Sequence, residues 1–545
     1  MASAKNIKKE ERLSGKKTSQ HDDRGNTRIA FFVIIAVTII AFFPSLQNGI
    51  TNWDDDKYLV ENPFIRDISW NGIQQISSAI VVGNYHPVTV LSYAIEYNLF
   101  RLIPTVYHVT NLFLHVLNSL MVFWFIYRLQ KNMLIAFAVG LMFGVHPLHV
   151  ESVAWISERK DLLYTAFFVG ALLSYLSYIV KNKHRRLYIA SIVLFMLSCL
   201  SKGMAVVLPV ILFIIDYHLG RKINKHSMRE KIPFFLIALI FGVIAVIAQH
   251  AAGATRGDEA YPIVDRPFIA FYGLMFYLYK MLVPIGLSCI YPYPAKTGGY
   301  LPPIFYVAPF ILLIIGGILW RMKKFRKEIV FGMAFFVICL LPVLQLLPVG
   351  YAIVADRYFY LSSIGVFYIL GVGFSFVYEM AKEKGPGMKT IVFIPGAMII
   401  LVLSFLTWNR TEIWKDSISL LENASKQYPA IPSLYNNIGM AYGDSGNVAK
   451  ELEYYQKTVE LDPRITEPYI NMAFRYASMD ENEKAIACYN KVIELEPDEQ
   501  IAYFNVGILY AKTGKDSMGI LCLQRAARLG NKESRDWLRD NGYGW

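Results

Sequence analysis

Three consecutive aspartates, Asp54, Asp55 and Asp56, follow the first long apolar run of the chain. A carboxylate beside a membrane loses hydration, which raises its pKa and allows it to act as a general base. Most charge runs are solvated loops, but this one lies beside Trp53 and Tyr58 in an apolar setting. We therefore predict that Asp54 or Asp55 is a catalytic base. We expect Asp56 to lie in the site wall, because alternate side chains of an extended segment point to opposite sides.

Lys202 lies between two apolar runs of 14 residues each, 187–200 and 204–217. As helices these runs would measure about 21 Å, which is less than the roughly 30 Å hydrocarbon core of a bilayer. We therefore expect the turn at 201–203 to lie below the membrane surface. The alternative is that the lysine side chain extends back to the head groups. A cation at that depth is a functional candidate, and a lipid phosphate is its natural partner.

A third group of polar side chains occurs in the motif HPLHVESVAWISERKD. Its histidines and first glutamate have the spacing of metal ligands, but Pro147 starts a new helix and removes the single-face geometry of a zinc site. We therefore expect these side chains to line a polar wall of the site without a metal. The predicted wall residues of this motif are His146, His149, Glu151, Arg159 and Asp161.

Asp356 and Arg357 precede another long apolar run. An arginine at this position can anchor a helix at the membrane interface, or it can bind a phosphate through two parallel hydrogen bonds. We predict the second role for Arg357 and place Asp356 in the wall of the same site.

Composition indicates what kind of protein holds these residues. The chain has 545 residues, of which 55 % are hydrophobic and 18 % charged, so it is predicted to be a polytopic membrane protein. Its five cysteines form no CxxC pair, which argues against a cysteine-based metal or redox site. Residues 1–408 contain 38 Lys and Arg against 22 Asp and Glu, whereas 409–545 contain 16 against 20. The basic clusters fall between apolar runs, a pattern that indicates membrane topology and excludes nucleic-acid binding.

The apolar runs predict about eleven spans in a membrane domain at 29–408, after a cytoplasmic basic tail at 1–28. A long outer loop at 47–106 follows the first span. We interpret 266–287 as interfacial or re-entrant, because counting it as a span would place the cations of 321–327 outside. Eleven spans place the C-terminal part outside the cytoplasm, and twelve would place it inside. The predicted spans are 29–46, 107–127, 133–146, 162–180, 187–200, 204–217, 232–249, 303–320, 329–348, 358–378 and 390–407.

Residues 409–545 contain a repeat with a 34-residue period, marked by Pro429, Pro463 and Pro497 and by aligned tyrosines and asparagines. This pattern is typical of tetratricopeptide repeats, in which pairs of helices stack and present a groove for an extended peptide or helix. The predicted fold is therefore all-α, a membrane helical bundle followed by a repeat solenoid. The predicted units are 430–463, 464–497, 498–531 and a capping helix at 532–545.

Several motifs occur in the order found in one family. They are WDD…NP (53–63), HPVTVLSYAIEY (86–97), YHVTNLFLHVLN (107–118), GVHPLHVESVAWISERKDLL (144–163), LSKGMAVVLPVILFIID (200–216) and ADRYFYLSSIG (355–365). With its C-terminal repeats, the chain resembles the transmembrane and tetratricopeptide-repeat (TMTC-like) O-mannosyltransferases of the GT-C glycosyltransferase group. The resemblance implies a GT-C-like membrane domain, a polyprenyl-phosphate-linked sugar donor and inverting transfer to a hydroxyl.

The resemblance also implies roles for single residues. The acidic pair of the family's first outer loop corresponds to Asp54 and Asp55. Lys202 and Arg357 would bind the donor phosphate and, together with His86, would offset the charge that develops on it.

The implied sugar is mannose-like and the implied acceptor is a protein or peptide held by the repeats. The protein would be embedded in a bacterial inner membrane or the endoplasmic reticulum, with its repeats on the periplasmic or lumenal side. Two departures from the family are visible: Gly203 stands where relatives more often have an acidic residue, and the tail has only about three repeats.

Two alternatives to this glycosyltransferase remain open. An oligosaccharyltransferase or glycan ligase would move a preassembled glycan and would favour a divalent metal at Asp54–Asp56. A non-enzymatic membrane scaffold would recruit envelope proteins through the repeats and would not need the acids. The main prediction requires no cofactor, and the absence of a βαβ nucleotide-binding pattern agrees with a donor that is already lipid-bound.

Overall fold

The computed structural model describes residues 25–180, 184–253, 261–347, 350 and 352–545. The chain divides into two compact units, Met1–Asp416 and Ser417–Trp545, which we describe separately. Helices dominate both, and the described residues contain a single two-stranded antiparallel sheet, in which β1 (Tyr291–Pro292) pairs with β2 (Ala352–Val354). The all-α prediction is confirmed.

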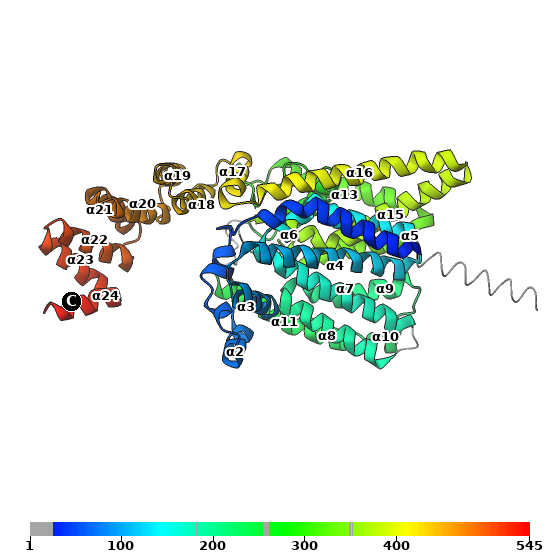
Figure 1. The fold of residues 1–545 in the computed structure, drawn as a ribbon, viewed down its shortest axis with the longest axis horizontal. Coiled ribbons are helices and arrows are strands. Elements are labelled where there is room, and N and C mark those ends of the chain that lie inside the picture. The colour runs from blue at the N-terminus through cyan, green and yellow to red at the C-terminus, as the bar shows by residue number, and fades with distance from the viewer. Residues whose placement is uncertain (1–24, 181–183, 254–260, 348–349, 351) are drawn as a thin grey trace, which may run out of the picture. The chain divides into compact units, whose positions relative to one another are not determined.

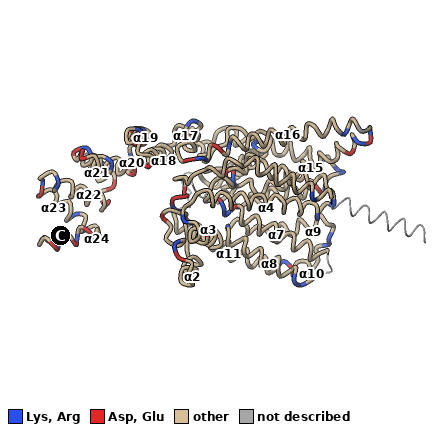
Figure 2. The backbone as a smooth tube through the Cα atoms, in the orientation of Figure 1, with Lys and Arg blue, Asp and Glu red and all other residues tan. Residues whose placement is uncertain are grey.

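The first unit is a bundle of long helices (Figure 1). The positions of charged residues along the backbone are found mainly toward the two ends of this bundle (Figure 2), as expected if its middle lies in hydrocarbon. After the helical segment Gly25–Gln47, its helices are α2 (Trp70–Ser78), α3 (Pro87–Phe100), α4 (Pro104–Gln130), α5 (Met133–Val145), α6 (Val150–Ala154), α7 (Arg159–Val180), α8 (Arg185–Ser201), α9 (Leu208–His218), α10 (Lys225–Arg229), α11 (Ile232–Ala251), α12 (Arg266–Leu282), α13 (Pro303–Arg321), α14 (Arg326–Leu340), α15 (Phe359–Glu383) and α16 (Pro386–Ile413).

Seven helical segments among the described residues are long and apolar enough to cross a membrane. An eighth span is possible if Met133–Val145 and Pro147–Ala154, which meet at a bend of 54°, count as one. The protein is therefore an integral membrane protein with several candidate spans. The seven segments are Gly25–Gln47, Pro104–Gln130, Ile156–Val180, Lys225–Ala251, Pro303–Arg321, Asp356–Glu383 and Gly387–Ile413.

Four of the eleven predicted spans do not reach this length by themselves. The run 133–146 corresponds to α5, which has 13 residues and reaches it only together with the bent segment Pro147–Ala154. The runs 187–200, 204–217 and 329–348 correspond to α8, α9 and α14, which have 17, 11 and 15 residues. Their lengths are between about 17 and 26 Å at 1.5 Å per residue, which is less than the roughly 30 Å of a hydrocarbon core. Length and composition thus support seven or eight spans, and eleven crossings stay a prediction.

Close helix contacts hold the bundle together where side chains are small. A Cβ atom at Gly332 on α14 would lie 2.5 Å from the carbonyl oxygen of Gly365 on α15, so a larger residue there would push the two helices apart. Polar contacts join other helices: His115 Nδ1 on α4 lies 2.8 Å from the Tyr360 hydroxyl on α15.

The segment after the first span folds against the end of the bundle. It contains a π-helical turn η2 (Asp56–Val60), a 3-10 turn η3 (Pro63–Arg66), and then α2 and α3. The predicted extended conformation at 54–56 is wrong, because the backbone coils from Asp54 onward: the Tyr58 N–H donates to the Asp54 carbonyl at 3.1 Å.

The C-terminal end of α16 is fixed at the same end of the bundle as this segment. The Gly49 N–H donates to the Lys415 carbonyl at 2.8 Å. The buried Trp414 ring stacks on Trp155 with 5.6 Å between ring centroids. The membrane unit therefore ends next to the loop that contains Asp54.

The second unit begins with α17 (Ser417–Gln427) and continues as helix pairs of the predicted repeat. Gly439 and Gly507 occupy the small-residue position of two repeats, and a Cβ at Gly439 would lie 2.6 Å from the ring of Tyr455. The 34-residue period therefore reflects close packing within each pair. The helices are α18 (Pro432–Asp444), α19 (Val448–Leu461), α20 (Glu467–Ser478), α21 (Asn482–Leu495), α22 (Gln500–Lys512), α23 (Asp516–Arg528) and α24 (Lys532–Asp540).

Candidate functional site

A buried carboxylate, Glu158, is the centre of a cluster of ionised side chains at the start of α7. Three cations contact it: Lys160 Nζ at 3.1 Å, Lys202 Nζ at 3.2 Å and Arg357 Nε at 3.3 Å. They come from three places in the chain, because Lys202 follows α8 and Arg357 lies in the turn η9 (Asp356–Tyr358). The structure thus brings together Lys202 and Arg357, two of the three residues, with His86, for which a role at the donor phosphate was predicted.

Two further acids complete the cluster. Asp161 Oδ1 lies 2.6 Å from Lys202 Nζ, and Glu151 pairs with the Arg357 guanidinium and accepts the Arg357 backbone N–H at 2.8 Å. Glu151 and Asp161 were predicted wall residues, and both are members of this ion-pair cluster. Lys202 and Arg357 are therefore not free cations, because each is already paired with buried carboxylates.

The accessible edge of the cluster is cationic. The side chains of the acids Glu151, Glu158 and Asp161 are only 1–2 % exposed, whereas those of Lys160, Lys202 and Arg357 are 9, 13 and 19 % exposed. Each cation also keeps a donor. Each ammonium has three N–H groups and makes two described polar contacts, and Arg357 Nη2 has no described partner. An anion that approaches would meet these donors first.

Asp54 lies beside this edge with its carboxylate unengaged. Among the described residues this carboxylate has no hydrogen-bond or ion-pair partner, and the residue is half-buried. Burial raises the pKa of Asp54, while the nearby charges of Lys160, Lys57 and Arg357 act in the opposite direction. Its φ of +79° lies in the left-handed region, a conformation that costs roughly 1–3 kcal/mol and persists only where the surroundings hold it.

The contacts of Asp55 hold the backbone of Asp54 in this conformation. Its carboxylate is buried and accepts four hydrogen bonds: from Thr51 N at 3.1 Å, Thr51 Oγ1 at 2.9 Å, Ser157 N at 2.8 Å and the Ser157 hydroxyl. Burial raises the pKa of Asp55 to about 6 in spite of these bonds. Because a carboxylate offers about four lone-pair sites, Asp55 has none left for a substrate. Its contacts join the loop to the residue that precedes Glu158.

Asp56 lies outside the cluster. It is the first residue of η2, and its Oδ1 accepts the backbone N–H of Lys57 at 2.9 Å. No described contact links its carboxylate to the three cations, so its predicted place in the site wall is not supported by contacts.

His86, the residue before α3, is buried, and neither ring nitrogen has a hydrogen-bond partner among the described residues. Its ring packs against Tyr58 with 5.4 Å between centroids. Burial, together with the positive charge of Lys160, lowers the pKa of His86 to about 3. The predicted role of His86 in offsetting phosphate charge therefore needs correction: a neutral imidazole can donate one N–H but contributes no charge.

Arg159, a predicted wall residue, faces away from the site. Its side chain is fully buried, pairs with Glu96 on α3, donates to Asn111 Oδ1 on α4 at 2.8 Å and donates to the Tyr107 carbonyl at 3.1 Å. These contacts use its donors to join α3, α4 and α7. Arg159 is thus a structural residue, and its placement in the wall was wrong.

His146, His149 and Asp356 also make structural contacts. His146 Nε2 lies 3.0 Å from the carbonyl of the last turn of α12, and His149 bridges the Phe143 carbonyl and a serine hydroxyl of α15. Asp356 accepts a hydrogen bond from the Tyr291 hydroxyl at 2.8 Å. All three are buried in contacts between elements, so their predicted placement in the wall is wrong for their side chains.

The described part of the chain contains no group of three or more His, Cys, Asp or Glu side chains arranged to hold a metal ion. The acids at 54–56, where the oligosaccharyltransferase alternative places a metal, diverge in their contacts. Asp55 is saturated by Thr51 and Ser157. The residues present therefore do not fit a metal at that place.

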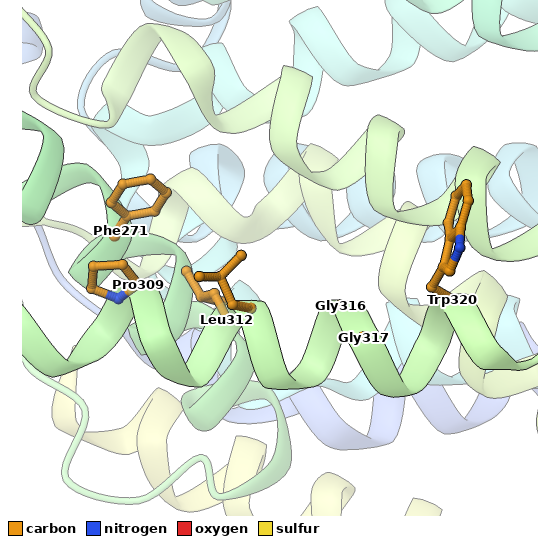
Figure 3. A pocket seen from close by; sticks show the side chains of 7 residues that line it. Phe271, Pro309, Leu312, Gly316, Gly317 and Trp320 are labelled. Atoms are coloured by element: carbon orange, nitrogen blue, oxygen red, sulfur yellow. The ribbon is translucent and has the colours of Figure 1, made fainter.

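An apolar groove of about 550 Å³ lies along α13 (Figure 3), and its lining includes Phe271, Leu312, Gly316 and Trp320. No charged residue lines it, and none of its residues contacts the Glu158 cluster. It therefore offers apolar surface and no group for proton or phosphoryl chemistry.

Sequence reasoning missed Glu158, Lys160 and Tyr58. The Tyr58 hydroxyl lies 3.4 Å from Lys160 Nζ, which also lies 4.8 Å from the centre of the Tyr58 ring. The signal was present: Glu158 to Asp161 are four consecutive charged residues at the start of an apolar helix, an expensive placement unless they pair.

Comparison with known proteins places the chain among homologues. Family models described as "Tetratricopeptide repeat" and "TPR repeat" match residues 432–465 and 475–514. "Protein O-mannosyl-transferase F38B6.6" of Caenorhabditis elegans is 27 % identical over 464 residues, which cover 79 % of this chain and 62 % of that protein. "Protein O-mannosyl-transferase TMTC3" of Mus musculus is 24 % identical over 423 residues, which cover 70 % and 44 %. "Protein O-mannosyl-transferase TMTC4" of Homo sapiens is 24 % identical over 502 residues, which cover 78 % and 65 %.

These matches confirm the resemblance: the chain is a homologue of the TMTC protein O-mannosyl-transferases and has tetratricopeptide repeats. It spans about half to two thirds of the length of these relatives. Among solved structures, the Archaeoglobus fulgidus oligosaccharyltransferase in its apo form matches 70 % of this chain and 56 % of that chain, with 14 % identity and a TM-score of 0.38. That score is too low to support an argument about fold or function.

Proposed function

We propose that this protein is an inverting glycosyltransferase that moves a mannose-like sugar from a polyprenyl-phosphate carrier to a hydroxyl of a protein. The observation that carries the proposal is the cationic edge of Lys160, Lys202 and Arg357 beside the unengaged carboxylate of Asp54. The names of the curated relatives support the sugar and the acceptor.

The reaction needs one base and one anion site. Asp54 accepts the proton of the acceptor hydroxyl. At the same time the oxygen of that hydroxyl attacks the anomeric carbon of the sugar from the face opposite the phosphate. The bond from the anomeric carbon to the phosphate oxygen breaks, and the leaving phosphate takes the bonding electrons. The free N–H donors of Lys160, Lys202 and Arg357 stabilise the charge that develops there. Asp54 fits the base better than Asp55, whose oxygens are occupied by Thr51 and Ser157.

The charge balance of the cluster favours a monophosphate carrier. With every group ionised, the three cations are balanced by Glu151, Glu158 and Asp161, and the Asp54 carboxylate beside them adds one negative charge before a donor binds. A sugar phosphodiester has one negative charge, which the remaining N–H donors can accommodate. A diphosphate carrier has a second charge and would need a further cation. The cluster thus fits transfer of a single sugar better than transfer of a preassembled glycan.

We place this site and the repeats on the extracytoplasmic side. Lys202 contacts Glu158, so α8 ends at the end of the bundle where α7 begins, and Lys415 lies there as well. The cationic segments at 221–231 and 321–327 join the helices at the opposite end. The positive-inside rule then assigns that opposite end to the cytoplasm. Eleven passes would require the short helices α8, α9 and α14 to cross as well.

The proposal is tested with the full chain in proteoliposomes and a panel of polyprenyl-phosphate sugars, polyprenyl-diphosphate glycans and hydroxyl-bearing peptides. We expect transfer from a monophosphate mannose donor, inversion at the anomeric carbon and unchanged activity in a chelator. Transfer from the diphosphate glycans alone would favour the ligase, and no transfer across the panel would leave the scaffold as the better reading.

A further inference from the structure

The apolar groove along α13 (Figure 3) lies in the part of this helix that the rest of the chain leaves uncovered. The buried residues of α13 are Phe305 and Ala308, both in its first half. The groove begins after them and follows the helix from Pro309 to Trp320. Of the described residues that line it, Phe271 belongs to α12 and the others belong to α13.

Two glycines form the floor of this groove. A Cβ atom at Gly316 or Gly317 would meet open space, with no atom of the described chain within 4 Å. Figure 3 shows this bare stretch of helix between Leu312 and Trp320. Glycine inside a helix costs about 1 kcal/mol relative to alanine, and no helix of the described chain packs on these two positions to offset that cost. A ligand can therefore pack directly on the helix backbone there.

The groove has the depth of one membrane leaflet. Pro309 and Trp320 are 11 residues apart, which is about 17 Å at 1.5 Å per residue. The hydrocarbon core of a bilayer is about 30 Å thick, and α13 is a candidate span. An acyl chain of a phospholipid extends through one leaflet, so its length matches that of the groove.

The end of the groove at Trp320 is cationic. Residues 321–327, which follow directly, contain five Lys and Arg and no acid. The guanidinium carbon of Arg326 lies 4.6 Å from the centre of the Trp320 ring. Arg326 Nε is buried and has no hydrogen-bond partner among the described residues. An arginine that stacks on an aromatic ring and keeps an unused N–H donor is suited to bind a phosphate.

This cationic end is far from the Glu158 cluster. The ring of Phe325, next to Arg326, packs on Phe376 of α15 with 5.1 Å between centroids. Phe376 is about 26 Å along α15 from the first turn of that helix, and η9 with Arg357 directly precedes the first turn. A carrier whose phosphate lies at the Glu158 cluster therefore cannot place the same phosphate at Arg326.

We propose that the groove along α13 binds an anionic phospholipid, with one acyl chain packed over Gly316 and Gly317 and the phosphate at Arg326 beside Trp320. Charge complementarity favours an anionic lipid over a zwitterionic one, because the five cations of 321–327 have no acid among them. The positive-inside rule assigns this end of the groove to the cytoplasmic leaflet. The inference does not depend on the proposed reaction, whose donor binds at the other end of the bundle.

The test uses the full chain, reconstituted in phosphatidylcholine vesicles that contain a small fraction of one of two photoreactive lipids. The first is a phosphatidylglycerol with a diazirine on its acyl chain, and the second is a phosphatidylcholine with the same chain. After illumination, the labelled peptides are identified and quantified by mass spectrometry. Labelling of α16, a candidate span that is little buried, serves as the reference for lipid that is merely adjacent.

Two variants alter the groove and two are matched controls. Gly316→Leu combined with Gly317→Leu fills the floor, and Arg326→Gln removes the cation. Gly373→Leu is the control for the glycines, because Gly373 is an exposed position of α15 where a Cβ also meets open space. Lys222→Gln is the control for the cation, since it lies exposed in the other cationic segment.

We expect phosphatidylglycerol to label 309–320 about five-fold more than phosphatidylcholine does, the ratio that corresponds to roughly 1 kcal/mol for one cation near a lipid phosphate. Both lipids should label α16 equally. Arg326→Gln should remove most of the preference, the double glycine variant should lose the label at 309–320, and both controls should behave like wild type.

Equal labelling of 309–320 by the two lipids in wild type would overturn the proposal, because the groove would then be ordinary lipid-facing surface. A preference that persists in Arg326→Gln would overturn it as well. Competition by unlabelled polyprenyl phosphate, without competition by unlabelled phosphatidylglycerol, would assign the groove to the carrier instead. Melting temperatures show whether the glycine variant is folded, and Arg326→Gln decides the question if it is not. None of these measurements requires sugar transfer.

Discussion

Replacing Asp54 by asparagine is the most informative perturbation of the site. The carboxylate has no described partner, so the change removes a proton acceptor without breaking a hydrogen bond or an ion pair. If Asp54 is the base, turnover should fall by about 10²–10⁴-fold, which corresponds to roughly 3–5 kcal/mol of transition-state free energy. Donor binding should persist, because the cations that would bind phosphate are untouched.

The backbone conformation of Asp54 allows asparagine without added strain. The φ of Asp54 is +79°, and asparagine adopts the left-handed region at least as readily as aspartate. The free energy of unfolding should therefore change by less than about 0.5 kcal/mol. Asp54→Ala would add a strain of roughly 1–2 kcal/mol, and is a poorer choice for that reason.

The assay compares the initial rate of transfer, the donor affinity and the melting temperature of wild type, Asp54→Asn and the control Asp56→Asn. Burial raises the pKa of Asp54 above its usual 3.8, so the wild-type rate should fall as the pH is lowered toward that raised value and the base becomes protonated. The variant should lose this acid limb together with its activity. Near-normal turnover in Asp54→Asn, or an acid limb that survives in it, would refute the assignment of the base.

Four further outcomes are expected. Lys202→Ala should weaken donor binding and also cost about 3–5 kcal/mol of stability because it leaves Asp161 buried without its partner; adding Asp161→Asn should restore the melting temperature but not the affinity for donor. Glu158→Gln should lower stability more than any neighbouring substitution, since three cations lose their shared counter-charge; a melting temperature like that of wild type would contradict the cluster. Folding raises the pKa of Asp55 from 3.8 to about 6, so its contribution to the free energy of unfolding is greatest below pH 3.8. That contribution should decline by about 3 kcal/mol as the pH rises to 6. Chemical denaturation of Asp55→Asn at a series of pH values should no longer show this decline. A reporter fused after residue 420 should be active only outside the cytoplasm, and activity inside would reverse the topology.

Periodic features of the fold could be predicted from the sequence because they are local. The 34-residue repeat reflects a small-residue contact that is seen at Gly439 against Tyr455 and again, 68 residues later, at Gly507 against Leu523. The long spans could be predicted from hydropathy because each one is a continuous apolar segment of the sequence. The short helices α8, α9 and α14 were counted as spans because hydropathy reports composition and does not report where a helix ends.

The site could be predicted only in part. Asp54, Lys202 and Arg357 stand out by their position beside apolar runs, and the structure brings all three to one place. The sequence does not show which charged residues pair with each other. Arg159 pairs with Glu96 in the core, whereas Lys160 pairs with Glu158 in the site. These pairs depend on contacts between α3, α7 and η9. The adjacent residues Arg159 and Lys160 therefore have different roles, one structural and one in the site. The packing of helices that are distant in the sequence determines which role each residue has.

The link between Gly49 and Lys415, with Trp414 stacked on Trp155, has a kinetic meaning. It fixes the last residues of the membrane unit, after which the repeat unit begins in the chain, next to the loop that also holds Asp54. On the proposed function, a polypeptide bound by the repeats would be a tethered reactant, because the repeats and the site belong to one chain, and tethering by a short linker corresponds to a local concentration on the order of millimolar. On that proposal, a tether would favour repeated modification of one polypeptide before release, so several of its hydroxyls would be modified in one binding event.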